Sequence, residues 1–163
     1  MGEITAPAPL TPAHDVSRFS CGKPALDAWL TERALKAEGR SARCFVVCSG
    51  KQVIGYYCLA AGAVRREQAP KTLSRNMPSA IPVLVIGRLA VDQTFHGRRL
   101  GEGLLKDALL RCLGAAREIG ARAVLVHAID DTVIPFYARF GFAAFPGEPR
   151  TLFLPLETIH RAL

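Results

Sequence analysis

Two short segments of the chain contain residues that could take part in chemistry. The first, HGRRLGEGLL from His96 to Leu105, separates an apolar stretch from a helical pattern. Arg98 and Arg99 supply two positive charges, and a helix N-terminus adds a partial one. Glycine lets backbone N–H groups approach a ligand closely, and the segment has three: Gly97, Gly101 and Gly103. Together they predict a cradle for a pyrophosphate, although any tight strand-to-helix turn also needs glycine.

The second segment is PFYARFGF, from Pro135 to Phe142. Its phenylalanines are typical of core residues around a helix that ends at Gly141. Tyr137 has two interpretations: a further core aromatic with a satisfied hydroxyl, or a phenol that donates a proton to a reacting group. Taken alone, the segment favours the first.

The apolar pattern predicts a mixed α/β chain in which helices flank a partly antiparallel sheet. Apolar residues recur at steps of three and four in Pro24–Glu38 and Leu100–Ile119, which indicates two amphipathic helices. We expect a basic loop over residues 64–80 and a short helix at Pro135–Phe140. Strands are expected within residues 1–10 and at Ala42–Cys48, Val53–Ala63, Pro82–Val91, Ala123–Ala128, Phe142–Phe145 and Thr151–Leu154.

The net charge of +7 is concentrated in the middle of the chain. Residues 33–122 carry sixteen basic and six acidic side chains, a balance of +10, against −2 before them and −1 after them. This concentration favours a polyanionic partner, because Lys and Arg attract phosphates with little regard to sequence. Ordinary solubility charge is the alternative.

Length and composition indicate the setting of the protein. A chain of 163 residues has room for a single domain, residues 1–163. Five cysteines with no C-x-x-C pair are typical of reduced, buried thiols in a cytoplasmic protein. No apolar run approaches the length of a membrane span, and Met1–Ile4 lacks the pattern of a signal peptide. The scattered histidines predict no metal site, and His127 is expected to be a hydrogen-bonded core residue.

The order of the motifs resembles the GCN5-related N-acetyltransferase (GNAT) superfamily. RLAV ends a strand, GRRLGEG opens a helix, and FYARFGF follows further along. The superfamily's phosphate loop, Q/R-x-x-G-x-G/A, is matched by Arg98, Gly101 and Gly103. The more usual register would start at His96 and have glycine in place of Arg99, so the chain departs from it there. The resemblance implies an acetyl-CoA-binding α/β fold whose mixed, mostly antiparallel sheet has six to seven strands.

Longer stretches are similar to the GNAT toxins of bacterial type II toxin–antitoxin systems, which acetylate aminoacyl-tRNA. These stretches are PLTPAHDVSRFSCGKPALDAWL, FVVCSGKQVIGYYCLAAGAV and NMPSAIPVLVIGRLAVDQ. The similarity implies acetyl-CoA as co-substrate without a metal, charged tRNA as acceptor, and a block of translation. It also implies a ribbon-helix-helix antitoxin, operator DNA bound only through the antitoxin complex, and no membrane association. Monomer and homodimer both stay open.

The resemblance implies roles for particular residues. Tyr137, the tyrosine of the F-Y-x-x-F-G-F segment, would be catalytic. Acetyl-CoA would be bound by Leu89, Ala90, Val91, Gly97, Arg98, Arg99, Leu100, Gly101, Glu102, Gly103 and Phe136. Charged tRNA would be held by Lys36, Arg65, Arg66, Arg75 and Arg88. Arg88 either pairs with a carboxylate or meets phosphate, and Asp130 and Asp131 either cap a helix or touch the co-substrate.

The chemistry of acetyl transfer is compatible with these roles. An α-amine has an ordinary pKa near 8, and an adjacent ester lowers it further, so no strong base is needed. Tyr137 would then act as a general acid toward the departing sulfur. Transfer of a proton from a phenol to a thiolate is uphill by about 2 kcal/mol, a cost that a desolvated thiolate tolerates. Backbone amides at the end of Pro82–Val91 would polarise the carbonyl.

Two other functions are consistent with the same motifs. One is a GNAT enzyme that acetylates a small amine or a protein N-terminus. Acetylation of polyamines, with charged tRNA left unmodified, would favour this function. The other is an inactive GNAT-fold corepressor module, which need not bind acetyl-CoA.

Overall fold

The computed structural model describes residues 3–163. Seven strands are hydrogen-bonded in the order β1-β2-β3-β4-β5-β7-β6. The strands are β1 (Ala8–Pro9), β2 (Arg43–Ser49), β3 (Gln52–Arg65), β4 (Ala80–Val91), β5 (Ala123–His127), β6 (Ala143–Phe145) and β7 (Glu148–Pro155). The α-helices are α1 (Pro24–Glu32), α2 (Ala34–Ala37), α3 (Lys71–Ser74), α4 (Leu100–Ile119) and α5 (Ile134–Ala138). The β4–β5 ladder is parallel, whereas β1–β2, β2–β3, β5–β7 and β6–β7 are antiparallel, which confirms the predicted fold class.

The chain forms two compact units. The first unit contains the chain up to Leu59 together with Arg88–Asp107, and the second contains Ala60–Gly87 with Ala108–Leu163. Strands β3 and β4 and helix α4 contribute residues to both units. A single domain over residues 1–163 stays a prediction.

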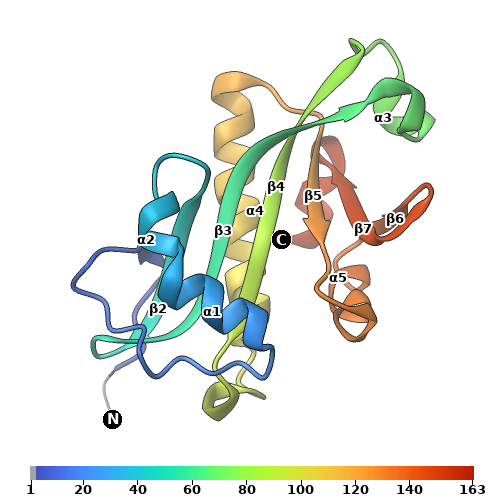
Figure 1. Ribbon diagram of the computed structural model, residues 1–163. Helices are drawn as coiled ribbons and strands as arrows, with labels where there is room; N and C mark the ends of the chain where they lie inside the picture. The colour runs from blue at the N-terminus through green and yellow to red at the C-terminus, as the bar shows by residue number, and fades with distance from the viewer. Residues whose placement is uncertain (1–2) are drawn as a thin grey trace. The chain divides into compact units, whose positions relative to one another are not determined.

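In the first unit, α1 and α2 pack on one face of β2 and β3 (Figure 1). Leu26, Leu30 and Ala34 face this core and are buried. The prediction of one continuous helix over Pro24–Glu38 was wrong, because Arg33 has φ −124° and separates α1 from α2. The Glu38 carboxylate accepts a hydrogen bond from the Cys44 amide at 2.7 Å, which draws the chain after α2 toward β2.

The other face of β3 packs against the beginning of α4. Gly55 permits this contact, since a Cβ there would lie 3.0 Å from Leu104 Cδ1 and 2.9 Å from a Val47 methyl. Tyr56 and Tyr57 point to opposite faces, as neighbours on a strand do. The Tyr56 hydroxyl donates to the Leu26 carbonyl at 2.7 Å, and the Tyr57 hydroxyl donates to the Asp107 carboxylate.

In the second unit, β5 pairs with β4 and β7, and β6 completes this part of the sheet (Figure 1). The prediction of a loop over residues 64–80 was only partly right, because this segment contains a 3₁₀ turn, η1 (Arg66–Gln68), and helix α3. Leu73 of α3 is fully buried in the core of this unit. Arg122 Nη2 donates to the Thr72 carbonyl at 2.6 Å and fixes the helix, a contact between distant positions that local patterns do not reveal.

All five cysteines are buried and free of disulfides, as their apolar surroundings predicted. Burial raises the pKa of Cys21 to about 11 and that of Cys112 to about 12. The thiols are therefore protonated at neutral pH and behave as small apolar groups. Across residues 3–163, no helix combines the length and the apolar character needed to cross a membrane.

Candidate functional site

The end of β4 has backbone groups that its neighbouring strands do not use. The ladder with β5 covers Val83–Ile86, whereas β4 continues to Val91. The Asp92 amide donates to the Ile54 carbonyl in β3 at 2.8 Å. Because neighbouring residues of a strand direct their N–H groups to opposite edges, the amides of Leu89 and Val91 point away from β3. They lie at an edge where an extended, amide-containing ligand can bind.

Ala90 is placed differently from its two neighbours. Its side chain is buried in the core beneath α1, and its carbonyl lies beside Gly55 of β3. The structure therefore favours Leu89 and Val91 over Ala90 for backbone contacts with a ligand. The Val91 carbonyl is already bound, because His96 Nε2 lies 2.7 Å from it. The Val91 amide is therefore the backbone group that can bind a ligand.

Two residues of the loop between β4 and α4 have the positive φ that is typical of glycine. Gly97 has φ +80°, which glycine adopts without strain. Arg99 has φ +60°, in the left-handed region, at the position where the usual motif has glycine. The departure from the motif therefore changes the residue and keeps the backbone conformation. Arg98 is exposed, and its guanidinium carbon lies 4.9 Å from the centroid of the Phe95 ring.

We expect Arg99→Gly to stabilise the protein by up to about 1 kcal/mol, because an L-residue in the left-handed region is strained by about that amount. Urea unfolding of the two proteins measures the difference. Gly97→Ala is the matched control and should destabilise, since it introduces the same strain at φ +80°. Lower stability of Arg99→Gly would show that the arginine side chain makes a compensating contact.

The first turn of α4 directs backbone amides toward the loop. Gly103 is exposed, and a Cβ there would meet no atom within 4 Å. Its amide donates to the Arg99 carbonyl at 3.1 Å, which begins the helical bonding. Glu102 pairs with Lys106 at 3.5 Å, so its negative charge is partly balanced on the helix surface. An anion at this helix end would meet amides, Arg98 and Arg99.

Asp92 holds the start of this loop and was missed by sequence reasoning. The residue is 4% exposed, and its carboxylate accepts hydrogen bonds from the amides of Ser20 and Thr94, each at 3.0 Å. The Thr94 hydroxyl donates to it as well, at 2.7 Å. The D-x-T pattern after an apolar strand signals such a turn, whereas the contact with Ser20 joins distant parts of the chain.

The structure distributes the remaining predicted residues between the two units. Lys36 and Arg88 lie in the first unit with Leu89–Val91 and the loop. Arg65, Arg66, Arg75, Phe136 and Tyr137 lie in the second unit. The three arginines are exposed, and Arg66 donates to the Met77 carbonyl at 2.9 Å, so part of its role is structural.

Tyr137 lies in α5 with its ring among aromatic neighbours. The ring centroid is 5.1 Å from that of Phe136 and 5.8 Å from that of Phe142, in edge-to-face arrangements. The residue is 5% exposed. The packing fixes the ring, so the position of the hydroxyl is determined by α5.

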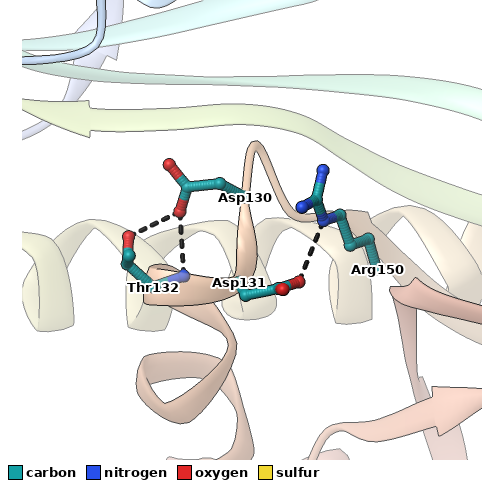
Figure 2. A network of polar contacts seen from close by, with 4 residues as sticks. All are labelled: Asp130, Asp131, Thr132 and Arg150. Atoms are coloured by element: carbon teal, nitrogen blue, oxygen red, sulfur yellow. Dashed lines mark hydrogen bonds and ion pairs between the residues drawn. The ribbon is translucent and has the colours of Figure 1, made fainter.

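The segment that leads into α5 is held by the network in Figure 2. Asp130 caps the 3₁₀ turn η3 (Asp131–Val133) by accepting hydrogen bonds from the amide and hydroxyl of Thr132. Asp131 pairs with Arg150 Nε at 2.9 Å. Asp130 therefore acts as a cap, one of the two interpretations that the sequence left open, whereas Asp131 forms an ion pair and caps no helix or turn.

The prediction that His127 is a core residue was wrong. His127 is exposed, and its Nδ1 lies 3.2 Å from Thr151 Oγ1 on β7. It is the last residue of β5, where the side chain passes beyond the core that buries Ala123–Val126. An apolar run in the sequence does not show at which residue burial ends.

Comparison of the chain with known proteins identifies its family. The family described as acetyltransferase (GNAT) domain matches residues 40–144. A tRNA-acetylating toxin of Mycobacterium tuberculosis (strain ATCC 25618 / H37Rv) is 46% identical over 159 residues, which cover 96% of this chain and 95% of the relative.

Two solved structures of the toxin AtaT are similar over nearly the whole chain. AtaT complexed with acetyl-methionyl-tRNAfMet has a TM-score of 0.88 and 28% identity, covering 97% of this chain and 98% of AtaT. A tyrosine-to-phenylalanine mutant of AtaT, bound to acetyl-CoA and the C-terminus of the antitoxin AtaR, has a TM-score of 0.83 and 27% identity, with 96% of each chain covered. The family match over residues 40–144 and the 46% identity to the mycobacterial toxin show that the chain belongs to the acetyltransferase (GNAT) family, as its motifs predicted.

Proposed function

We propose that the chain is an acetyl-CoA-dependent toxin that acetylates the α-amine of the amino acid on charged tRNA and so blocks translation. The observation that carries the proposal is the 46% identity to the mycobacterial tRNA-acetylating toxin over 96% of this chain. The AtaT complex with acetyl-methionyl-tRNAfMet supports the same acceptor class.

Acetyl-CoA is expected to bind at the end of β4 and the start of α4. The amides of Leu89 and Val91, directed away from β3, suit the amide groups of pantetheine. The pyrophosphate suits the loop from Gly97 to Gly103, where helix amides, Arg98 and Arg99 supply positive charge. Leu100, Gly101 and Glu102 contribute backbone to this cradle. Phe136, next to Tyr137 in α5, is the remaining proposed contact.

Tyr137 is proposed to be the general acid. It is the tyrosine of the FYARFGF segment, and its ring is held by edge-to-face contacts with Phe136 and Phe142. In the reaction the amine nitrogen forms a bond to the acetyl carbon, the C–S bond breaks, and the departing sulfur needs a proton. A phenol supplies that proton, and the amine releases its own proton to solvent.

Charged tRNA is expected to bind through the excess of positive charge in the middle of the chain. Residues 33–122 have a balance of +10, and Lys36, Arg65 and Arg75 are exposed. Binding that depends on such groups falls steeply with salt, because phosphate contacts release counterions. The AtaT complex with the C-terminus of AtaR supports an antitoxin as the second partner. We expect operator DNA to be bound only through that complex.

The direct test is to incubate the protein with acetyl-CoA and charged tRNA. Mass spectrometry of the released amino acids should find them N-acetylated. Uncharged tRNA, free amino acids and polyamines serve as comparison acceptors. Acetylation of polyamines with charged tRNA untouched would contradict the proposal, and so would no product with any acceptor.

Gly103→Ala is expected to raise the KM for acetyl-CoA by about tenfold or more, equivalent to about 1.4 kcal/mol. The added methyl would project into open space at the first turn of α4, and we expect the pyrophosphate to approach the helix amides through this space. The same change should stabilise α4 by up to about 1 kcal/mol, because alanine is the better helix former. Steady-state kinetics and urea unfolding measure the two effects.

Gly114→Ala is the matched control for this variant. Gly114 lies in the same helix, and a Cβ there also meets nothing within 4 Å. It should stabilise the protein in the same way and leave the KM for acetyl-CoA unchanged. Equal KM values for the two variants would show that the pyrophosphate does not approach Gly103.

A further inference from the structure

Arg88 lies near the end of β4 with its guanidinium held over an aromatic ring. The guanidinium carbon is 4.4 Å from the centroid of the Trp29 ring in α1. A planar guanidinium stacks on an indole face and keeps its N–H donors directed outward in the plane. The contact therefore fixes the orientation of the cation and leaves donors for a ligand.

The Trp29 ring is itself held in place. It stacks on Tyr56 at 6.0 Å with an interplanar angle of 8°. The Tyr56 ring is fully buried, and its hydroxyl donates to the Leu26 carbonyl at 2.7 Å. Arg88, Trp29 and Tyr56 thus form a stack whose base lies in the core of the first unit.

Arg88 has no ion-pair partner in the described part of the chain. Among residues 3–163, no carboxylate forms an ion pair with it. The positive charge of Arg88 lies near the Cys58 thiol: burial raises the pKa of that thiol, and Arg88 offsets part of the rise. A thiol is a weak acceptor. A partly buried arginine whose partners are an indole and a thiol still has strong donors for an anion.

Arg88 and the proposed acetyl-CoA groups lie on different parts of β4. Leu89 and Val91 offer backbone amides at the strand edge, and the loop after them has its own arginines for the pyrophosphate. The Arg88 side chain points toward the face that α1 covers, where Ala90 is also buried. A second phosphate-bearing substrate is the ligand that this cation suits.

We propose that Arg88, stacked on Trp29, binds a phosphodiester at the 3′ end of the acceptor RNA and so positions the terminal aminoacyl nucleotide. The inference rests on the proposed function and makes it more specific. It favours phosphate over a carboxylate as the partner of Arg88, the choice that the sequence left open.

The test compares two acceptors that differ by one phosphate: an adenosine carrying the amino acid as a 3′ ester, and the same compound with a 5′-phosphate. The wild type should have the lower KM for the phosphorylated acceptor. Arg88→Gln should raise that KM by about ten- to hundredfold, as loss of a hydrogen-bonded charge does, and leave the KM of the unphosphorylated acceptor unchanged. Arg88→Lys should restore part of the affinity, because lysine keeps the charge and loses the planar fork.

Four results would overturn the proposal. A raised KM for acetyl-CoA in Arg88→Gln would assign the phosphate to the co-substrate. Equal effects on both acceptors, or a loss confined to kcat, would show that Arg88 does not bind the acceptor phosphate. A similar change in Arg18→Gln, which removes an exposed charge from the same unit, would reduce the effect to general electrostatics.

A binding measurement separates failure of this proposal from failure of the proposed function. Fluorescence anisotropy of a labelled, uncharged RNA hairpin that ends in CCA needs no acetyl transfer. Weaker binding by Arg88→Gln than by wild type supports the phosphate contact even if no acceptor is acetylated. Equal binding by the two proteins, with wild-type acetylation intact, would contradict this inference and leave the proposed function standing.

Discussion

Tyr137→Phe is expected to lower kcat for acetyl transfer by about 10²–10⁴-fold, the usual contribution of a general acid. The ring contacts with Phe136 and Phe142 do not involve the hydroxyl and should persist. Acetyl-CoA should bind as before, because the Tyr137 hydroxyl is not among its proposed contacts. Single-turnover kinetics with charged tRNA measures the loss, and calorimetry measures binding of acetyl-CoA.

Tyr57→Phe is the matched control because it deletes the same atom from another buried tyrosine. Its hydroxyl donates to the Asp107 carboxylate, so its loss should destabilise the protein by about 1–3 kcal/mol. The kcat should not change. Undiminished activity of Tyr137→Phe would remove the tyrosine from the mechanism and direct attention to a proton donor from solvent.

The sequence predicted those parts of the site that depend on local patterns. The apolar run before Val91, the glycine-rich turn and the periodic helix after it define β4, the loop and α4 within a few neighbouring residues. The left-handed backbone at Arg99 could not be read from the residue type, since arginine rarely adopts it. The motif required glycine there, and the structure retains the conformation that the motif needs.

The features that the sequence did not predict depend on contacts between distant segments. Trp29 has the spacing of an ordinary core residue on a helix, and nothing local shows that Arg88 lies over it. The break at Arg33 is a feature of the backbone that the apolar periodicity of Pro24–Glu38 does not show. Periodicity locates a face of a helix or strand, whereas the partner of that face is a property of the fold.

Asp92→Ala is expected to destabilise the protein by about 2–3 kcal/mol at neutral pH, because it leaves buried amides without an acceptor. The carboxylate binds the amides of Ser20 and Thr94 and the Thr94 hydroxyl. The KM for acetyl-CoA should also rise, since these bonds hold the segment that leads from β4 into the proposed phosphate loop. Urea unfolding and steady-state kinetics measure the two effects.

The pH dependence of this variant identifies the charge as the cause. Burial alone would raise the pKa of Asp92, but the hydrogen bonds from Thr94 and Ser20 outweigh it and hold the pKa below its ordinary value of 3.8. A lowered folded-state pKa gives stability that is complete above the unfolded pKa and is lost as pH falls through the folded one. The difference between wild type and Asp92→Ala should therefore be largest near neutral pH and shrink below about pH 4.

Asp92→Asn separates the charge from the shape of the turn. Asparagine keeps an acceptor oxygen for the Ser20 or Thr94 amide and should lose less stability than alanine. Its deficit relative to wild type should also shrink in acid, because wild-type Asp92 loses its charge there and asparagine has none to lose. A gap between Asp92→Ala and wild type that stays constant from pH 7 to pH 3 would contradict this account. The carboxylate would then act as a space-filling group, and the loop would be held by the bond from the Gln93 amide to the Ser20 carbonyl at 2.8 Å.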